Sequence, residues 1–202
     1  MKQTKIIALT SLCIAALSAT MATQAAVPLP LGWYAEGNVG EPNISNITYA
    51  TNSSNSTTGI GWNLSAGYKF MPFFALEGGY TTYATTNAKF NGTTVAKGTS
   101  QSFDLVGKAI LPIQNSGFEF IAKLGVGRTK THVTNSDNSF AVANGIAVNA
   151  GTFNSTSLVY GVGGEYAFTP EMLVNAQWVR SDGGSGTGDL DLYSIGVAYM
   201  FG

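Results

Sequence analysis

The final stretch of the chain, residues 191–201, alternates bulky apolar side chains with small or flexible ones. Its bulky residues occupy every second position: Tyr193, Ile195, Val197, Tyr199 and Phe201. Because the side chains of a β-strand point alternately to its two faces, this pattern predicts a strand with one apolar face and one slim face. The aromatic residues lie near the ends of the apolar row, as in strands that cross a bilayer between two interfacial girdles. Such a strand needs partners that close the sheet on itself, because lipid cannot satisfy the backbone groups of an open edge.

Seven earlier stretches show the same alternation and are predicted to be strands. They lie at residues 33–40, 60–70, 74–82, 103–111, 118–126, 158–168 and 172–180. The connections alternate between long and short, and the long ones are predicted to be polar loops at residues 41–58, 84–101, 128–155 and 182–188. Antiparallel neighbours joined in this way place every long loop at one end and every tight turn at the other, as in outer-membrane barrels. The sequence therefore predicts an all-β chain that folds as an eight-stranded antiparallel up-and-down transmembrane β-barrel.

The first 25 residues have the composition of a secretory signal peptide. Lys2 and Lys5 form a basic start, an apolar segment follows, and Ala25 ends a small-residue cleavage site. We therefore expect residues 26–202 to form the mature outer-membrane β-barrel. The only cysteine, Cys13, lies inside this leader, so the mature chain is expected to have neither disulfides nor thiol chemistry. No later segment is long and apolar enough to be a membrane helix, so any membrane span is expected to consist of strands.

The charged residues of the predicted strands fall on the slim, inward faces. They are Glu36, Lys69, Glu77, Asp104, Lys108, Glu119, Lys123 and Glu165. A charge inside a narrow barrel has to be paired, because desolvating it alone costs several kcal/mol. We expect these acids and bases to interleave into a polar network that fills the lumen and holds the barrel rigid. The alternative is a gated ion path or a proton relay.

Two of these strands are joined by a short turn, which predicts specific partners. Asp104 and Lys108 lie on one strand, and Glu119 and Lys123 lie on the next. A hairpin centred near residue 114 would bring Lys108 close to Glu119 and Lys123 towards Asp104. The register could slip by two residues without exchanging the faces.

The bulky aromatic residues of the strands are predicted to form an outer belt that faces the membrane. They are Trp62, Tyr68, Phe74, Tyr80, Phe120, Tyr160, Tyr166, Phe168, Trp178, Tyr193, Tyr199 and Phe201. A secreted lipocalin-like barrel, also eight-stranded, is the soluble alternative. It would require an apolar interior, whereas the inward positions of this chain carry glycines and carboxylates. The placement of the charges therefore favours the membrane barrel.

Three short motifs carry a resemblance to a known family. They are Phe74-Ala-Leu-Glu-Gly-Gly-Tyr80, Gly161-Val-Gly-Gly-Glu-Tyr166 and the closing Tyr199-Met-Phe201. With the strand count and the loop alternation, the mature chain resembles the eight-stranded outer-membrane β-barrels similar to OmpA and OmpX. The resemblance implies an integral outer-membrane protein of a Gram-negative bacterium, exported through the periplasm, with both termini in the periplasm. In two departures from the family pattern, Gly202 follows the terminal aromatic residue, and no peptidoglycan-binding domain of the OmpA kind is expected.

No catalytic or metal-binding constellation is predicted. His132 is the only histidine, and a catalytic base or metal ligand would need partners that the spacing does not supply. We expect it to be a solvated residue at the rim of the barrel. We likewise expect no cofactor and no enzymatic activity.

The predicted function is that of a surface protein in which the barrel is an anchor. Its long external loops would be available for adhesion or for contact with a host or the environment. The alternative is a small pore or transporter for ions or small solutes. The expected partners are outer-membrane lipid and lipopolysaccharide, the barrel-assembly machinery during insertion, and an extracellular ligand at the loops. The formal net charge of −1 offers no basic surface for nucleic acid.

Overall fold

The computed structural model describes residues 30–201, apart from residues 48, 51–52, 114–115, 137 and 185–186. The predicted signal peptide lies outside the described residues, as does Gly202, so the leader and its boundary with the barrel stay predictions. The elements are β1 (Gly32–Ser45), β2 (Ser54–Thr57), β3 (Gly61–Met71), β4 (Phe74–Thr82), β5 (Thr86–Phe90), β6 (Thr93–Pro112), β7 (Phe118–Asn135), α2 (Asn138–Ala143), β8 (Gly151–Ala167), β9 (Met172–Asp182) and β10 (Asp189–Phe201). In the described part of the chain, no helix is long and apolar enough to cross a membrane.

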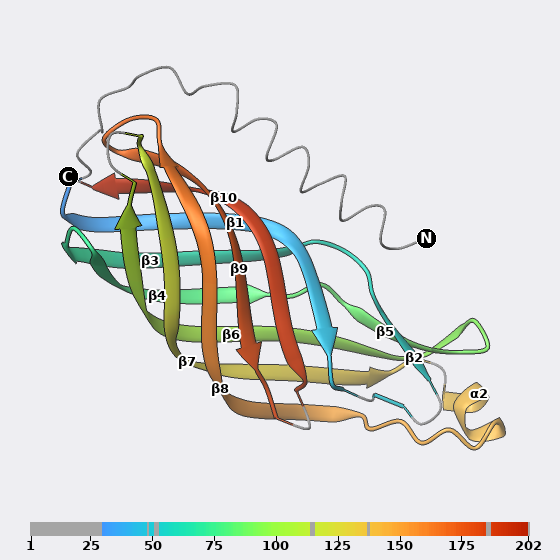
Figure 1. Ribbon diagram of the computed structural model, residues 1–202. Helices are drawn as coiled ribbons and strands as arrows, with labels where there is room; N and C mark the ends of the chain where they lie inside the picture. The colour runs from blue at the N-terminus through green and yellow to red at the C-terminus, as the bar shows by residue number, and fades with distance from the viewer. Residues whose placement is uncertain are drawn as a thin grey trace.

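Eight antiparallel strands form a closed ring in the order β6, β4, β3, β1, β10, β9, β8 and β7, and β7 pairs back with β6 (Figure 1). The first and last strands of the chain are neighbours, with Trp33 opposite Phe201 and Ser45 opposite Asp189. Closure leaves no unpaired edge in the ring, which is the condition that a bilayer imposes on a sheet. The predicted fold class, an eight-stranded antiparallel up-and-down barrel, is confirmed.

The connections alternate as predicted, but several strands extend well beyond the predicted apolar segments. At the end with the long connections, β6 begins at Thr93, β7 continues to Asn135 and β8 begins at Gly151. The prediction of loops over 84–101 and 128–155 was therefore partly wrong. Polar side chains do not prevent a strand, because the ladder is held by backbone hydrogen bonds.

Two short strands were also missed within the predicted loops. The strand β5 pairs with the extension of β6, and β2 pairs with β5, so the sheet continues past the ring on one side. Figure 1 shows this extension together with α2 at the end of the barrel opposite the tight turns. The connections from β1 to β3 and from β4 to β6 therefore each contain a strand of their own.

Candidate functional site

The lumen contains the charged side chains that the alternation predicted to face inward. Asp104 is half-buried, and the other seven are buried: Glu36, Lys69, Glu77, Lys108, Glu119, Lys123 and Glu165. Inward placement follows from the strand alternation, since the residues on either side of each charge face outward and are more exposed.

The centre of the lumen is a chain of ion pairs built around Glu36 of β1. Its carboxylate lies 3.4 Å from Lys108 Nζ of β6 and 3.3 Å from Lys123 Nζ of β7. Lys123 also contacts Glu77 of β4 at 2.8 Å, and Lys108 pairs with Glu165 of β8. Three carboxylates and two ammonium groups from five strands are thus joined across the interior. Each buried charge has an opposite charge within contact distance, as burial requires.

Neutral side chains complete the hydrogen bonding of these carboxylates. Gln177 Nε2 and Asn38 Nδ2 each donate to Glu36 Oε1 at 2.8 Å. The Tyr34 hydroxyl donates to Glu77 Oε2 at 2.8 Å, and the Lys108 ammonium lies 5.1 Å from the centre of its ring. The prediction of the site named charged residues alone and omitted these partners. Tyr34 and Asn38 occupy inward positions of β1, and Gln177 occupies one of β9, so the alternation would have identified them.

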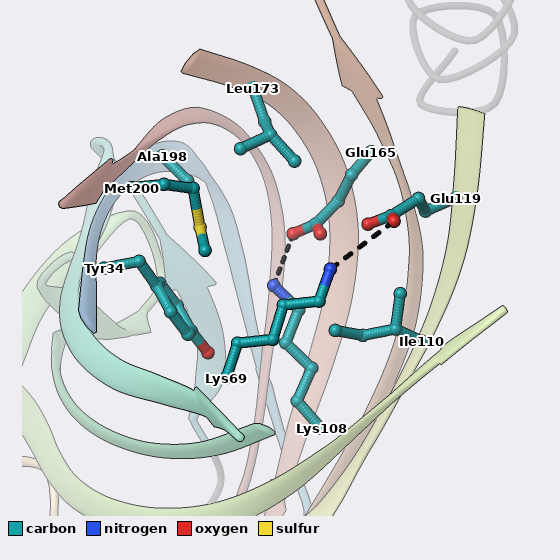
Figure 2. A pocket seen from close by; sticks show the side chains of 9 residues that line it. All are labelled: Tyr34, Lys69, Lys108, Ile110, Glu119, Glu165, Leu173, Ala198 and Met200. Carbon is teal, nitrogen blue, oxygen red and sulfur yellow. Dashed lines mark hydrogen bonds and ion pairs between the residues drawn. The ribbon is translucent and has the colours of Figure 1, made fainter. Parts of the chain in front are cut away.

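A fifth ion pair joins Lys69 of β3 to Glu119 of β7, with 3.6 Å between Nζ and Oε1 (Figure 2). This corrects the expectation that Lys108 would pair with Glu119. In the structure Lys108 lies directly opposite Lys123, because the hairpin pairs Pro112 with Glu119 and turns later than expected.

The expected pairing of Lys123 with Asp104 was wrong for the same reason. The residue opposite Asp104 is Gly127, and Lys123 instead binds Glu36 and Glu77. Lys108 and Lys123 lie side by side on neighbouring strands and repel each other. Glu36 contacts both lysines, although its strand, β1, pairs with neither β6 nor β7. The ion pairs cross the lumen instead of following the hairpin.

Two small cavities in the lumen have separate linings, with no residue in common. One, shown in Figure 2, lies among Tyr34, Lys69, Lys108, Glu119 and Glu165, with apolar side chains on its other side. The other has a wall that includes Asp104, Glu77, Lys123 and Ser194. Each has a volume of about 20 Å³. That is room for roughly one water molecule. The interior is therefore filled mainly by side chains.

Apolar and hydroxyl-bearing layers lie on either side of the charges. Towards the tight turns, an apolar cluster fills the lumen: Tyr34, Ala75, Ile110, Ile121, Ala167, Leu173, Ala198 and Met200. Towards the long connections, hydroxyl groups hydrogen-bond across the interior, with Thr129 Oγ1 3.1 Å from the Oγ atoms of both Ser157 and Ser181. This hydroxyl layer was not predicted, because residues 128–155 were interpreted as loop.

Three of the four long connections, those between β1 and β3, β4 and β6, and β7 and β8, pack together into a cap with a small apolar core. It consists of Tyr49, Ala50, Ala88, Val95, Ala96, Val133, Ala141 and Ile146. Ala50 and Val148 form an antiparallel bridge, which joins the connection after β1 to the one before β8. A Cβ on Gly98 of β6 would lie 2.5 Å from the Tyr49 ring, so only glycine leaves room for that ring. Burial raises the pKa of the Tyr49 phenol above its usual value.

The predicted aromatic belt lies on the outer surface of the ring. Eight of its members are exposed, and Tyr80, Tyr160, Tyr166 and Trp178 are half-buried. The half-buried rings pack on aromatic neighbours, such as Tyr160 on Trp178 at 5.8 Å between ring centres. Pairs of belt residues six positions apart lie near the two ends of an apolar row on four strands: Trp62 and Tyr68, Phe74 and Tyr80, Tyr160 and Tyr166, Tyr193 and Tyr199. Trp33, Phe70, Phe103 and Phe118 belong to the same surface and were not included in the prediction.

His132 is exposed on the outer face of the β7 extension. Its Nδ1 lies 2.9 Å from the Thr152 hydroxyl of β8. Within the described ranges, no group of three or more His, Cys, Asp or Glu side chains is placed to hold a metal ion.

Comparison with known proteins places this architecture in a family. The family model for the outer membrane protein beta-barrel domain matches residues 11–201. The chain belongs to this family. It is accordingly an integral protein of the bacterial outer membrane, and the predicted resemblance and location are confirmed.

Solved barrels share the fold at low sequence identity. OprG from Pseudomonas aeruginosa superposes with a TM-score of 0.59 at 16% identity, covering 87% of this chain and 99% of its own. Neisserial surface protein A gives 0.56 at 16% identity, covering 84% and 97%. Ail from Yersinia pestis gives 0.54 at 17% identity, covering 85% and 100%. No curated protein matches the sequence. These likenesses show the fold alone.

Proposed function

We propose that this outer-membrane barrel is a non-enzymatic surface protein, in which a closed barrel anchors a cap of external loops that binds an extracellular ligand. The observation that carries the proposal is the filled lumen. Ion pairs from five strands meet at its centre, and two cavities beside them have about 20 Å³ each. A hydrated ion needs far more room than a site for roughly one water molecule. As a barrel of this family, the chain would reach the membrane as a client of the barrel-assembly machinery.

The cap supports the ligand-binding part of the proposal. Its connections pack around a shared apolar core and carry an exposed surface that includes Val142, 71% exposed on α2. A surface that is already ordered loses less conformational freedom when it binds a partner. Loops that are ordered by their own core are therefore suited to recognition.

A small pore is the second candidate, and the polarity of the lumen supports it. The Asn175 amide and the Ser194 hydroxyl are buried without a hydrogen-bond partner among the described residues. Ser194 also lines the cavity beside Asp104. Groups of this kind would be satisfied by water entering from the capped end.

Single-cysteine labelling in intact cells distinguishes these candidates. The mature chain is expected to be free of cysteine, so Val142→Cys on the cap and Ser102→Cys in the lumen each introduce one thiol. With a membrane-impermeant maleimide, we expect Val142→Cys to be labelled and Ser102→Cys, at a position only 1% exposed, to react only after denaturation. Labelling of folded Ser102→Cys would support the pore. A Val142→Cys thiol that reacts only after the cells are broken would place the cap in the periplasm and refute the proposal.

A further inference from the structure

The outer face of β7 changes from apolar to basic where it leaves the aromatic belt. Its outward row runs through Phe120, Leu124 and Val126 and then continues with Arg128 and Lys130, all of them exposed. The outward direction of the two basic residues is secure, because Thr129 and Thr131 alternate with them and are fully buried in the lumen. The six-residue aromatic spacing found on four other strands would place a second aromatic residue of β7 at Val126, six positions after Phe120. This strand instead carries two cations just beyond that position.

The neighbouring strands leave these cations without an anion. The outward positions opposite Arg128 and Lys130 are Phe103 and Gln101 on β6, and Thr156 and Asn154 on β8. In the described part of the chain, neither basic side chain makes a hydrogen bond or an ion pair within the protein.

On the opposite side of the ring, the outward basic residue is paired with an acidic one. There Arg180 of β9 is held by Asp191 of β10, with both guanidinium contacts at 2.9 Å. Glu41 of β1 and Asp189 of β10 add further acidic side chains to that wall, on strands that lie across the ring from β6 and β7. The unpaired basic charge is therefore confined to one side of the barrel. General attraction of the whole chain for anions does not explain it, since the formal net charge is −1.

We propose that Arg128 and Lys130 bind the phosphate groups of lipopolysaccharide in the outer leaflet. Barrels of this kind place their long connections outside the cell, so this part of β7 lies where the acyl region ends and the phosphorylated headgroup begins. Guanidinium and ammonium groups are the usual protein partners of phosphate. The acyl chains of the same lipid would lie along the apolar row below, on Val126 and Leu124. The inference rests on the outer-membrane location and does not depend on what the cap binds.

The test measures lipid affinity with detergent-folded protein and purified lipopolysaccharide. The double variant Arg128→Gln/Lys130→Gln is compared with Lys89→Gln/Lys97→Gln, which removes the same charge from exposed positions further out on β5 and β6. We expect the first variant to lose at least about tenfold in affinity, since a hydrogen bond to a charged group contributes roughly 1.5–3 kcal/mol and 1.4 kcal/mol is a factor of ten. The control and the charge-preserving Arg128→Lys/Lys130→Arg are expected to bind within about threefold of the native protein.

Dephosphorylated lipopolysaccharide and inorganic phosphate complete the design. The native protein should bind the dephosphorylated lipid as weakly as Arg128→Gln/Lys130→Gln does, and inorganic phosphate should bind far more weakly than the intact lipid. An unchanged affinity in Arg128→Gln/Lys130→Gln would overturn the proposal, as would an equal loss in the control. Tight binding of inorganic phosphate alone would also overturn it, because the site would then serve a free anion. Heat-modifiable migration on gels verifies that each variant is folded.

Discussion

Glu36 shows, at the scale of a residue, why inward charges could be predicted but their partners could not. Its position on the inner face follows from the alternation of β1 alone. Its partners, Lys108 and Lys123, lie on β6 and β7, and neither strand pairs with β1. Contacts across the lumen depend on which non-adjacent strands face each other in the closed ring. The alternation within a single strand does not specify this. The expected pair of Lys108 with Glu119 failed on register, because the hairpin turns later than expected and places Lys123 opposite Lys108.

The corrected pairing predicts the outcome of double-mutant cycles. Lys108→Ala leaves Glu36 and Glu165 short of a counter-charge, so we expect a loss of about 3–5 kcal/mol in the free energy of unfolding. Lys108→Ala and Glu165→Ala together should cost less than the sum of the single changes, whereas Lys108→Ala and Glu119→Ala should be close to additive. Urea unfolding of the detergent-folded protein measures both cycles, with exposed Lys97→Ala as the control. Strong coupling of Lys108 to Glu119 and none to Glu165 would contradict the ion pairs described above.

At the scale of the element, the sequence predicts the membrane-spanning strands better than the external extensions. The strand β4 was predicted with its observed bounds, Phe74–Thr82, because lipid on one side and a narrow lumen on the other impose a strict period of two. The extensions of β6, β7 and β8 lie beyond the lipid, where a strand meets water and no such pattern is required. The hydroxyl layer and the cap could not be predicted, because Ser- and Thr-rich strands have the same composition as loops.

The cap is expected to open independently of the barrel, since its core is separate from the lumen. Ala141 of α2 is 1% exposed in that core, and its neighbour Val142 is 71% exposed. An Ala141→Asp change would bury an unpaired carboxylate, at a cost of several kcal/mol that such a small core cannot offset. We expect rapid cleavage of the external connections by protease while heat-modifiable migration of the barrel is retained. Val142→Asp is the matched control and should be cleaved like the native protein; equal cleavage of both variants would show that the cap is not packed as described.

At the scale of the whole molecule, the closure of the ring also determines that its interior is filled. Closure satisfies the backbone in lipid, and eight strands enclose a space that side chains are large enough to fill. Seven of the eight charges in the lumen are mutually paired, so most of the groups that could line an ion path instead join the strands across it. We therefore propose that the barrel is an anchor and that the cap and the outer wall recognise ligands.

Planar-bilayer recording of the purified, folded protein tests this account most directly. The central cluster of ion pairs and the layers on either side of it should block ion flow, so the native protein is expected to give no steady single-channel steps at neutral pH. The variant Lys108→Ala/Lys123→Ala, which leaves the central carboxylates unpaired, is the comparison, and its conductance should exceed that of the native protein. Steady, reproducible steps from the native barrel would contradict the anchor and establish the pore.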